Sequence, residues 1–210
     1  MEKFSKEEYI DILKEIGNIG AGNATTALSF MIDSRIELSV PKAEVIDFNK
    51  LMDITGGAEQ VVAGIYIDIS RDIEGVMLFM VSCETARILV DSVMHNDPKD
   101  QVTNFMFNEI ELSAFTEIGN IITGAYLSSI SSLLGFTIIP SVPYMTIDMA
   151  GAILSVPAIE FSKKSDTAIL IESEFKINNK KMDGYFVLIP TEESYYKIIE
   201  KLGVLMKPWF

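Results

Sequence analysis

The sequence predicts an α/β fold of the layered α+β type, built as a pseudo-two-fold duplicated unit with a sheet of about six strands and two long motif-bearing helices. The same order of elements (helix, strand, short helix, strand, strand, helix) occurs twice in 210 residues. Matched residues lie 102 positions apart, since Asn18 corresponds to Asn120 and Pro41 to Pro143. Each half offers only about three strands, so one shared sheet of about six is the natural way to complete a core. We therefore expect a single domain over 1–210, with pseudo-repeats at about 6–96 and 103–205.

The first half opens with helical periodicity from Glu7 to about Ile32. Apolar and β-branched runs at 34–48, 61–70 and 74–82 predict strands, and 83–96 predicts a closing helix. A turn-rich connector follows at 95–100. The apolar face predicted for the first helix consists of Ile12, Ile16, Ile19, Ala27 and Met31.

The second half repeats this order. Residues 107–134 predict a helix, 135–148 one strand, and 148–161 a short helix followed by irregular chain. Residues 167–177 and 180–190 predict a hairpin around Asn178 and Asn179, and 192–203 a final helix.

Composition excludes several classes of function. Lys and Arg number 17 against 30 Asp and Glu, so the net charge is −13. This charge argues against nucleic acid and against an anionic membrane surface as partners. The single cysteine, Cys83, and the single histidine, His95, cannot build a disulfide or a structural zinc site, and they favour a reducing, cytoplasmic location. No metal site is expected.

One uncharged stretch, from Ile118 to Ile147, has the length of a membrane span. It contains several serines as well as Pro140 and Pro143. We therefore interpret it as buried structure of a soluble protein, with no membrane insertion.

The most informative pattern is a polar stripe that occurs in both long helices. At about 100° per residue, steps of four and three return a side chain to nearly the same side of a helix. Glu-Ile-Gly-Asn occurs in both stripes, and 22 residues separate each Asn from a proline, Pro41 or Pro143. The stripes comprise Asp11, Glu15, Asn18 and Gly22 in the first half, and Ser113, Glu117, Asn120 and Gly124 in the second.

Glycine in a helix costs about 1 kcal/mol against alanine. This cost must be offset at the four glycines of the motif helices, Gly17, Gly22, Gly119 and Gly124. We expect that they let a partner approach the neighbouring Asn closely. An Asn amide is neither acid nor base, but it can hold a water by hydrogen bonds. That suits hydrolysis of an activated phosphoryl group, in which the protein supplies position. A carboxylate would repel phosphate, so Glu15 and Glu117 make more sense paired with a cation of the partner.

The motif Asp/Ser-x3-Glu-x2-Asn-x22-Pro, met twice here, resembles the signature of the CheC/CheX/FliY family of chemotaxis phosphatases. The resemblance covers essentially the whole chain, and two intact copies in about 210 residues without a switch domain are similar to the CheC branch of that family. It implies that Asn18 and Asn120 orient the attacking water on the phospho-aspartate of the response regulator CheY. Glu15 and Glu117 would pair with the regulator's lysine.

The same resemblance implies no cofactor of the chain's own, with Mg²⁺ held by the regulator. It also implies binding of CheD, a receptor deamidase that enhances the phosphatase, near Asp148, Met149 and Gly151. Two alternatives stay open: a CheD-binding adaptor with little catalysis, and a flagellar-switch-like scaffold. A solvated helix face would explain one Glu-x-x-Asn, but two copies at equal spacing to a proline favour function.

Overall fold

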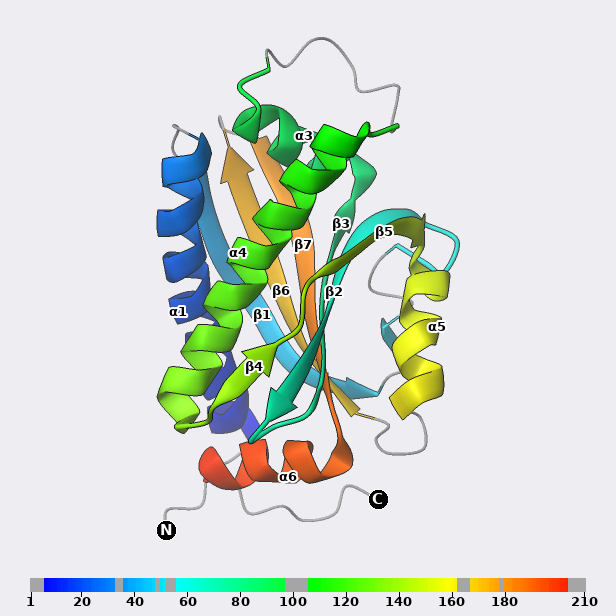
Figure 1. Ribbon diagram of the computed structural model, residues 1–210. Helices are drawn as coiled ribbons and strands as arrows, with labels where there is room; N and C mark the ends of the chain where they lie inside the picture. Colours follow the sequence, from blue (N-terminus) through cyan, green and yellow to red (C-terminus); the bar gives the residue numbers. More distant parts are fainter. Residues whose placement is uncertain are drawn as a thin grey trace.

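The protein forms an antiparallel sheet of seven strands with two long helices on one face, as a computed structural model shows for residues 6–32, 36–47, 50–51, 56–96, 106–161, 167–177 and 180–203 (Figure 1). The sheet order is β1-β6-β7-β3-β2-β4, and β5 also pairs with β2. The fold class predicted from the sequence is confirmed. In chain order the elements are α1 (Lys6–Ile32), β1 (Ile36–Asp47), β2 (Val61–Arg71), β3 (Gly75–Ser82), α3 (Cys83–Val93), α4 (Glu109–Leu134), β4 (Ile138–Pro140), β5 (Tyr144–Met149), α5 (Ala150–Phe161), β6 (Thr167–Ile177), β7 (Lys180–Pro190) and α6 (Glu192–Lys201).

Strands from the two halves of the chain are intermixed in the sheet. β3 and β7 pair at its centre, β2 and β6 flank them, and β1 and β5 lie outside. Thus β1 of the first half pairs with β6 of the second, and β5 of the second pairs with β2 of the first. The strand that follows each long helix is therefore held by the opposite half.

The long helices α1 and α4 run antiparallel, side by side, across one face of the sheet (Figure 1). The main core lies beneath them and is rich in aromatic rings. Tyr126 of α4 stacks on Phe186 at a centroid distance of 4.1 Å, and Phe186 stacks on Phe79 at 4.7 Å. On the other face, α5 buries Ala150, Ile153 and Leu154 in a second apolar cluster.

Two predicted details are wrong, and a third lies outside the described residues. The single strand expected at 135–148 is broken at residues 141–143 into β4 and β5, so the sheet has seven strands rather than about six. The irregular chain expected after the start of α5 is helical to Phe161, and Pro157 lies inside that helix. Proline removes one backbone donor but tolerates helical φ, so it need not end a helix whose apolar face is buried. The predicted turn at Asn178 and Asn179 lies outside the described residues, although β6 and β7 pair as expected.

The buried face of α1 also differs from the predicted one. Ile19 is 36% exposed and Ala27 is exposed, whereas Leu13, Ala24 and Leu28 are buried. The reason is that small residues form part of the face of α1 that packs on α4. A Cβ on Gly20 would lie 3.0 Å from Tyr126 Cα and Ser129 Oγ of α4. Small residues let two helix backbones approach closely, which a count of large apolar residues misses.

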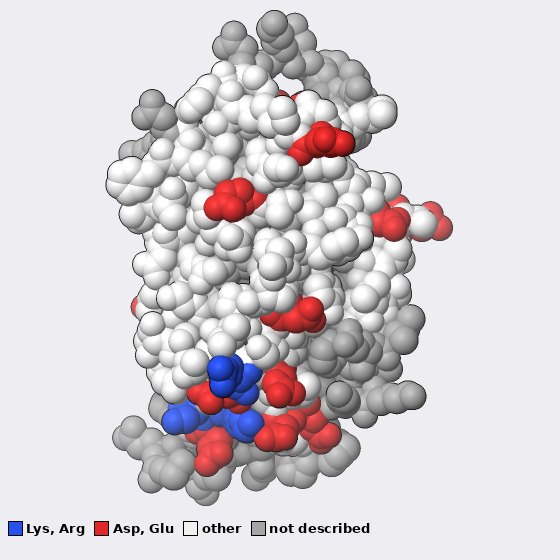
Figure 2. Space-filling model, viewed as in Figure 1, with Lys and Arg blue, Asp and Glu red and all other residues white. Residues whose placement is uncertain are grey.

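None of the helices described here is long and apolar enough to cross a membrane. Cys83 is buried at the start of α3, and His95 is exposed with a positive φ of 53°. Much of the face that carries α1 and α4 is uncharged, and basic side chains gather only toward the end where α6 lies (Figure 2).

Candidate phosphatase site

Both predicted stripes lie on the surface of their helices. Asp11, Glu15 and Asn18 of α1 are exposed, and so is Gly22. In α4, Ser113, Glu117 and Asn120 are exposed, and Gly124 is partly exposed. The structure therefore presents each Glu and Asn to solvent on one side of its own helix.

The register of the two helices is set by a close crossing. Gly20 lies against Tyr126, and the Ser129 hydroxyl donates to the carbonyl oxygen of Ile16 at 3.2 Å. Because α1 and α4 are antiparallel, the two stripes run in opposite directions on neighbouring helices (Figure 1). One face of the molecule thus carries two separate sites.

In the first copy, Asn18 is tied to the strand that contains Pro41. The pairing of β1 with β6 shifts register between Ser39 and Lys42, so Val40 and Pro41 form a bulge. The Val40 backbone N–H donates to Asn18 Oδ1 at 3.3 Å. The spacing of 22 residues between Asn and Pro therefore corresponds to a contact, because the residue before the proline reaches the Asn.

The second copy lacks this contact. Val142, which corresponds to Val40, is 87% exposed, whereas Val40 is 3% exposed. Among the described residues, the Asn120 side chain makes no hydrogen bond. Asn120 is therefore presented to solvent, and its amide makes no hydrogen bond to the described residues.

The four glycines in or beside the stripes serve two different purposes. A Cβ on Gly17 would lie 3.2 Å from Val40 and Ile171, and a Cβ on Gly119 would overlap Ile65. These two glycines therefore let each helix approach the chain's own sheet, which corrects the expectation that a partner requires them. A Cβ on Gly22 or Gly124 would meet nothing within 4 Å. Open space beside these two positions leaves room for a partner to approach the Asn.

The carboxylates of the stripes are available for an external cation. Glu15 and Glu117 form no ion pair with any described residue. In the part of the chain that the structure describes, no group of three or more His, Cys, Asp or Glu side chains converges as a metal site would.

The residues predicted near a CheD contact are placed at the end of β5 and the start of α5. Asp148 and Met149 are exposed, and the Met149 N–H donates to Asp148 Oδ1 at 2.7 Å. Gly151 instead faces its own chain, since its N–H donates to the Ala58 carbonyl at 2.9 Å and a Cβ would lie 3.0 Å from Ala58 Cβ. Packing alone thus accounts for this glycine.

Sequence reasoning missed Val40 as part of the first site. Its contribution is a backbone N–H, which carries no residue-type signal. The one available signal was its place before Pro41 in a strand, because proline in a strand marks an edge or a bulge where ladder hydrogen bonds are interrupted.

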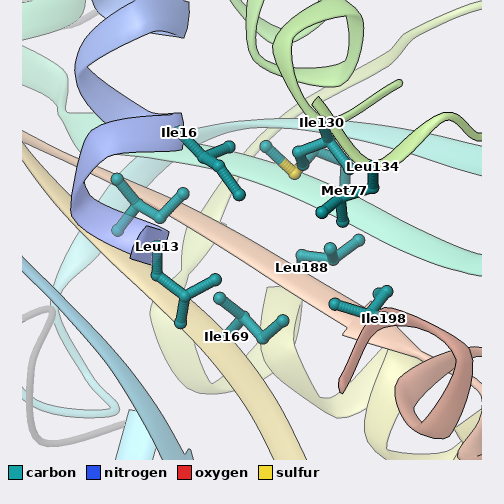
Figure 3. A pocket seen from close by; sticks show the side chains of 9 residues that line it. Leu13, Ile16, Met77, Ile130, Leu134, Ile169, Leu188 and Ile198 are labelled. Carbon is teal, nitrogen blue, oxygen red and sulfur yellow. The ribbon is translucent and has the colours of Figure 1, made fainter. Parts of the chain in front are cut away.

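The described residues line a cavity of about 20 Å³ between the first half of α1, the end of α4 and α6 (Figure 3). Nine apolar side chains from α1, α4, α6 and the sheet line it, and Leu13, Ile16 and Met77 are among them. It is a packing void of the core and offers no polar group to a substrate.

The fold is shared with solved structures of other proteins. It resembles FliY of Thermotoga maritima with a TM-score of 0.75 at 24% identity, covering 95% of this chain and 98% of that one. It also resembles a chain of the FliM–SpeE complex from H. pylori with a TM-score of 0.69 at 13% identity, covering 96% and 97%.

Sequence similarity is more specific. The profile of the CheC-like family matches residues 9–45 and 110–147, which contain the two motif copies from Asp11 to Pro41 and from Ser113 to Pro143. The CheY-P phosphatase CheC of Bacillus subtilis (strain 168) is 31% identical over 200 residues, covering 94% of this chain and 95% of that protein. The chain belongs to the CheC-like family.

Proposed function

We propose that this chain is a protein aspartyl-phosphate phosphatase that hydrolyses the phospho-aspartate of the response regulator CheY in the cytoplasm. The observation that carries the proposal is the pair of exposed Glu/Asn stripes, each beside a glycine whose surroundings are open. The relative from Bacillus subtilis, similar over 94% of this chain, is named a CheY-P phosphatase.

In the proposed reaction, the amide of Asn18 or Asn120 enters the regulator's active site and holds a water in line with the phosphorus. The water oxygen forms a bond to phosphorus, and the bond from phosphorus to the aspartate oxygen breaks to release the carboxylate. Both hydrogens of the water stay with the inorganic phosphate, which leaves as dihydrogen phosphate. The Asn supplies orientation rather than proton transfer. Mg²⁺ on the regulator would neutralise the phosphoryl oxygens.

Glu15 and Glu117 take the role of docking groups. A carboxylate near a phosphoryl group is repelled by it, so each Glu would pair with the regulator's lysine and hold the Asn at its position. The face that carries both stripes is largely uncharged (Figure 2). With a net charge of −13, attraction to a locally negative phosphorylated regulator must come from such specific pairs.

The test is the rate at which phospho-CheY loses its phosphate with wild type, Asn18→Ala, Asn120→Ala and the double variant. We expect the double variant to lose about 100-fold in catalysed rate, the scale seen when a positioned hydrogen-bonding group is removed. Circular dichroism verifies folding. Wild-type activity in a folded double variant would reject Asn18 and Asn120 as the groups that position the water. No acceleration by the wild-type protein would reject the phosphatase function and leave a switch scaffold, a role that the FliM-like fold allows.

A second role as an adaptor for CheD is supported by the exposed Asp148 and Met149 at the end of β5. Asp148→Lys reverses the charge at this corner and should weaken binding of CheD in a pull-down. Glu74→Lys, an exposed substitution between β2 and β3, is the matched control. Undiminished CheD binding by Asp148→Lys would remove this corner from the interface.

A further inference from the structure

The two copies of the motif differ at the residue before the proline. Val40 is buried against Gly17, and its N–H donates to Asn18. Val142 is turned to solvent, and Gly119 is packed by Ile65. The same sequence pattern thus gives two local structures.

The first structure follows from the bulge in β1. The bulge removes Val40 from the pairing with β6 while its side chain stays buried, so its N–H needs another acceptor. Asn18 Oδ1 provides it. The amide oxygen is therefore directed at the sheet, and the two hydrogens of Nδ2 are the part of the amide left for a ligand.

The second structure follows from how Ser141 is held. Its N–H donates to the Asp68 carbonyl at 2.8 Å, and its hydroxyl accepts from the Asp68 N–H at 3.0 Å. These two bonds hold Ser141 on β2, and Val142, the next residue, is 87% exposed. The Asn120 oxygen consequently has no backbone donor from this segment.

This difference matters because a water must attack through a lone pair. An acceptor that binds one of the water's hydrogens leaves both lone pairs of the water free to face phosphorus, whereas an N–H donor occupies one of the two. The amide oxygen is therefore the atom of the Asn better suited to orient the water. The Asn120 oxygen accepts no hydrogen bond from the described residues, whereas the bond from Val40 occupies one of the two lone pairs of the Asn18 oxygen and directs this oxygen to the sheet.

We infer that the two sites are unequal: Asn120 carries most of the turnover, and the Val40 N–H acts as a positioning group that holds Asn18 in a less active orientation. This inference rests on the proposed phosphatase function. Asn18 then serves chiefly to satisfy the bulge and to contact the partner.

The first experiment compares the single variants in the phospho-CheY assay. Asn120→Ala should lose at least about fivefold more activity than Asn18→Ala, the factor expected for one hydrogen bond of typical strength. If the double variant is inactive but the singles are equal, or Asn18→Ala is the more damaging, the inference is overturned and the phosphatase function stands. A fully active double variant would also overturn the inference, whereas a wild-type protein that does not accelerate the loss of phosphate would reject the function itself.

The second experiment needs no phosphatase activity. Nuclear magnetic resonance should show the Asn18 side-chain amide to be more ordered than that of Asn120, and Asn18→Ala should speed hydrogen exchange at the Val40 N–H. Equal order of the two amides, or unchanged exchange at Val40, would contradict the proposal.

A third experiment releases Asn18 without changing any side chain. In the Asn120→Ala background, replacing the Val40 amide by an ester removes the N–H. The rate of the remaining site should rise about threefold or more, since the oxygen is set free. An unchanged or lower rate would overturn the role given to Val40.

Discussion

The backbone N–H of Val40 donates to Oδ1 of Asn18 at 3.3 Å, joining a strand bulge to a helix 22 residues earlier in the chain. This contact gives a physical reason for the fixed distance between Asn and Pro in the first motif. Pro41 has no N–H and interrupts the ladder, and the N–H of its neighbour is satisfied by the Asn. The asparagine is thus part of the structure as well as of the proposed chemistry.

The first prediction concerns stability. Asn18→Ala should lower the free energy of unfolding by about 1 kcal/mol, because it leaves the Val40 N–H without its acceptor. Asn120→Ala is the matched control, and it should change stability little because its side chain bonds no described residue. Urea unfolding measures both values. Equal losses in the two variants would mean that the contact at Val40 contributes nothing.

The second prediction separates the two kinds of glycine. Gly119→Ala should destabilise the protein by about 1–3 kcal/mol, since its Cβ would overlap Ile65 in the central part of the sheet. Gly124→Ala, one turn along the same helix, meets nothing within 4 Å and should instead stabilise by up to about 1 kcal/mol. Thermal unfolding checks both changes.

The rate on phospho-CheY tests whether a partner approaches the open space at Gly124. Gly124→Gln places a side chain in the open space beside Asn120 and should reduce the rate on phospho-CheY without loss of stability. A stable Gly124→Gln variant with full activity would show that no partner approaches this turn of α4.

Much of the fold could be predicted from the sequence. The strands β6 and β7 run over 167–177 and 180–190 as predicted, because both are continuous β-branched and apolar runs between clear breakers. The stripes are exposed as predicted. The apolar side of each long helix packs on the sheet, so the polar side faces solvent.

Other features depend on tertiary contacts that no local pattern encodes. The buried face of α1 includes Gly20, whose role is visible only once Tyr126 of α4 lies against it. The break between β4 and β5 depends on the bonds from Ser141 to Asp68, which is 73 residues away. The inequality of the two sites could not be predicted for the same reason, since their motifs match at every position except Asp11 and Ser113.

The third prediction concerns the pair that ties α3 to the start of α4. Arg87 donates to the Glu111 carboxylate at 2.5 Å and to the Met106 carbonyl at 2.8 Å, and its guanidinium lies 4.1 Å from the Phe107 ring centroid. The bond from Arg87 lowers the pKa of Glu111. Glu111 also closes a capping box with Asn108.

Glu111→Gln should therefore cost about 1–3 kcal/mol at pH 7. A carboxyl whose pKa is lowered by folding contributes stability above its unfolded pKa of about 4.3 and loses it as the pH falls through the lower folded value. The gap between wild type and Glu111→Gln should accordingly shrink below about pH 4 in urea titrations. A gap that stays constant down to pH 3 would show that the charge of Glu111 is not what stabilises the pair.

The last prediction tests the role given to the exposed carboxylates. Glu117 forms no ion pair with a described residue, so a cation of the partner can reach it. Glu117→Gln keeps the shape of the side chain but removes its charge, and it should raise the KM for phospho-CheY more than it lowers kcat. It should also weaken the salt dependence of kcat/KM, because an exposed ion pair is screened between low salt and 0.5 M.

Glu109→Gln, also exposed on α4 but two turns away, is the control. A lower kcat at unchanged KM would assign Glu117 to the chemical step instead of to docking.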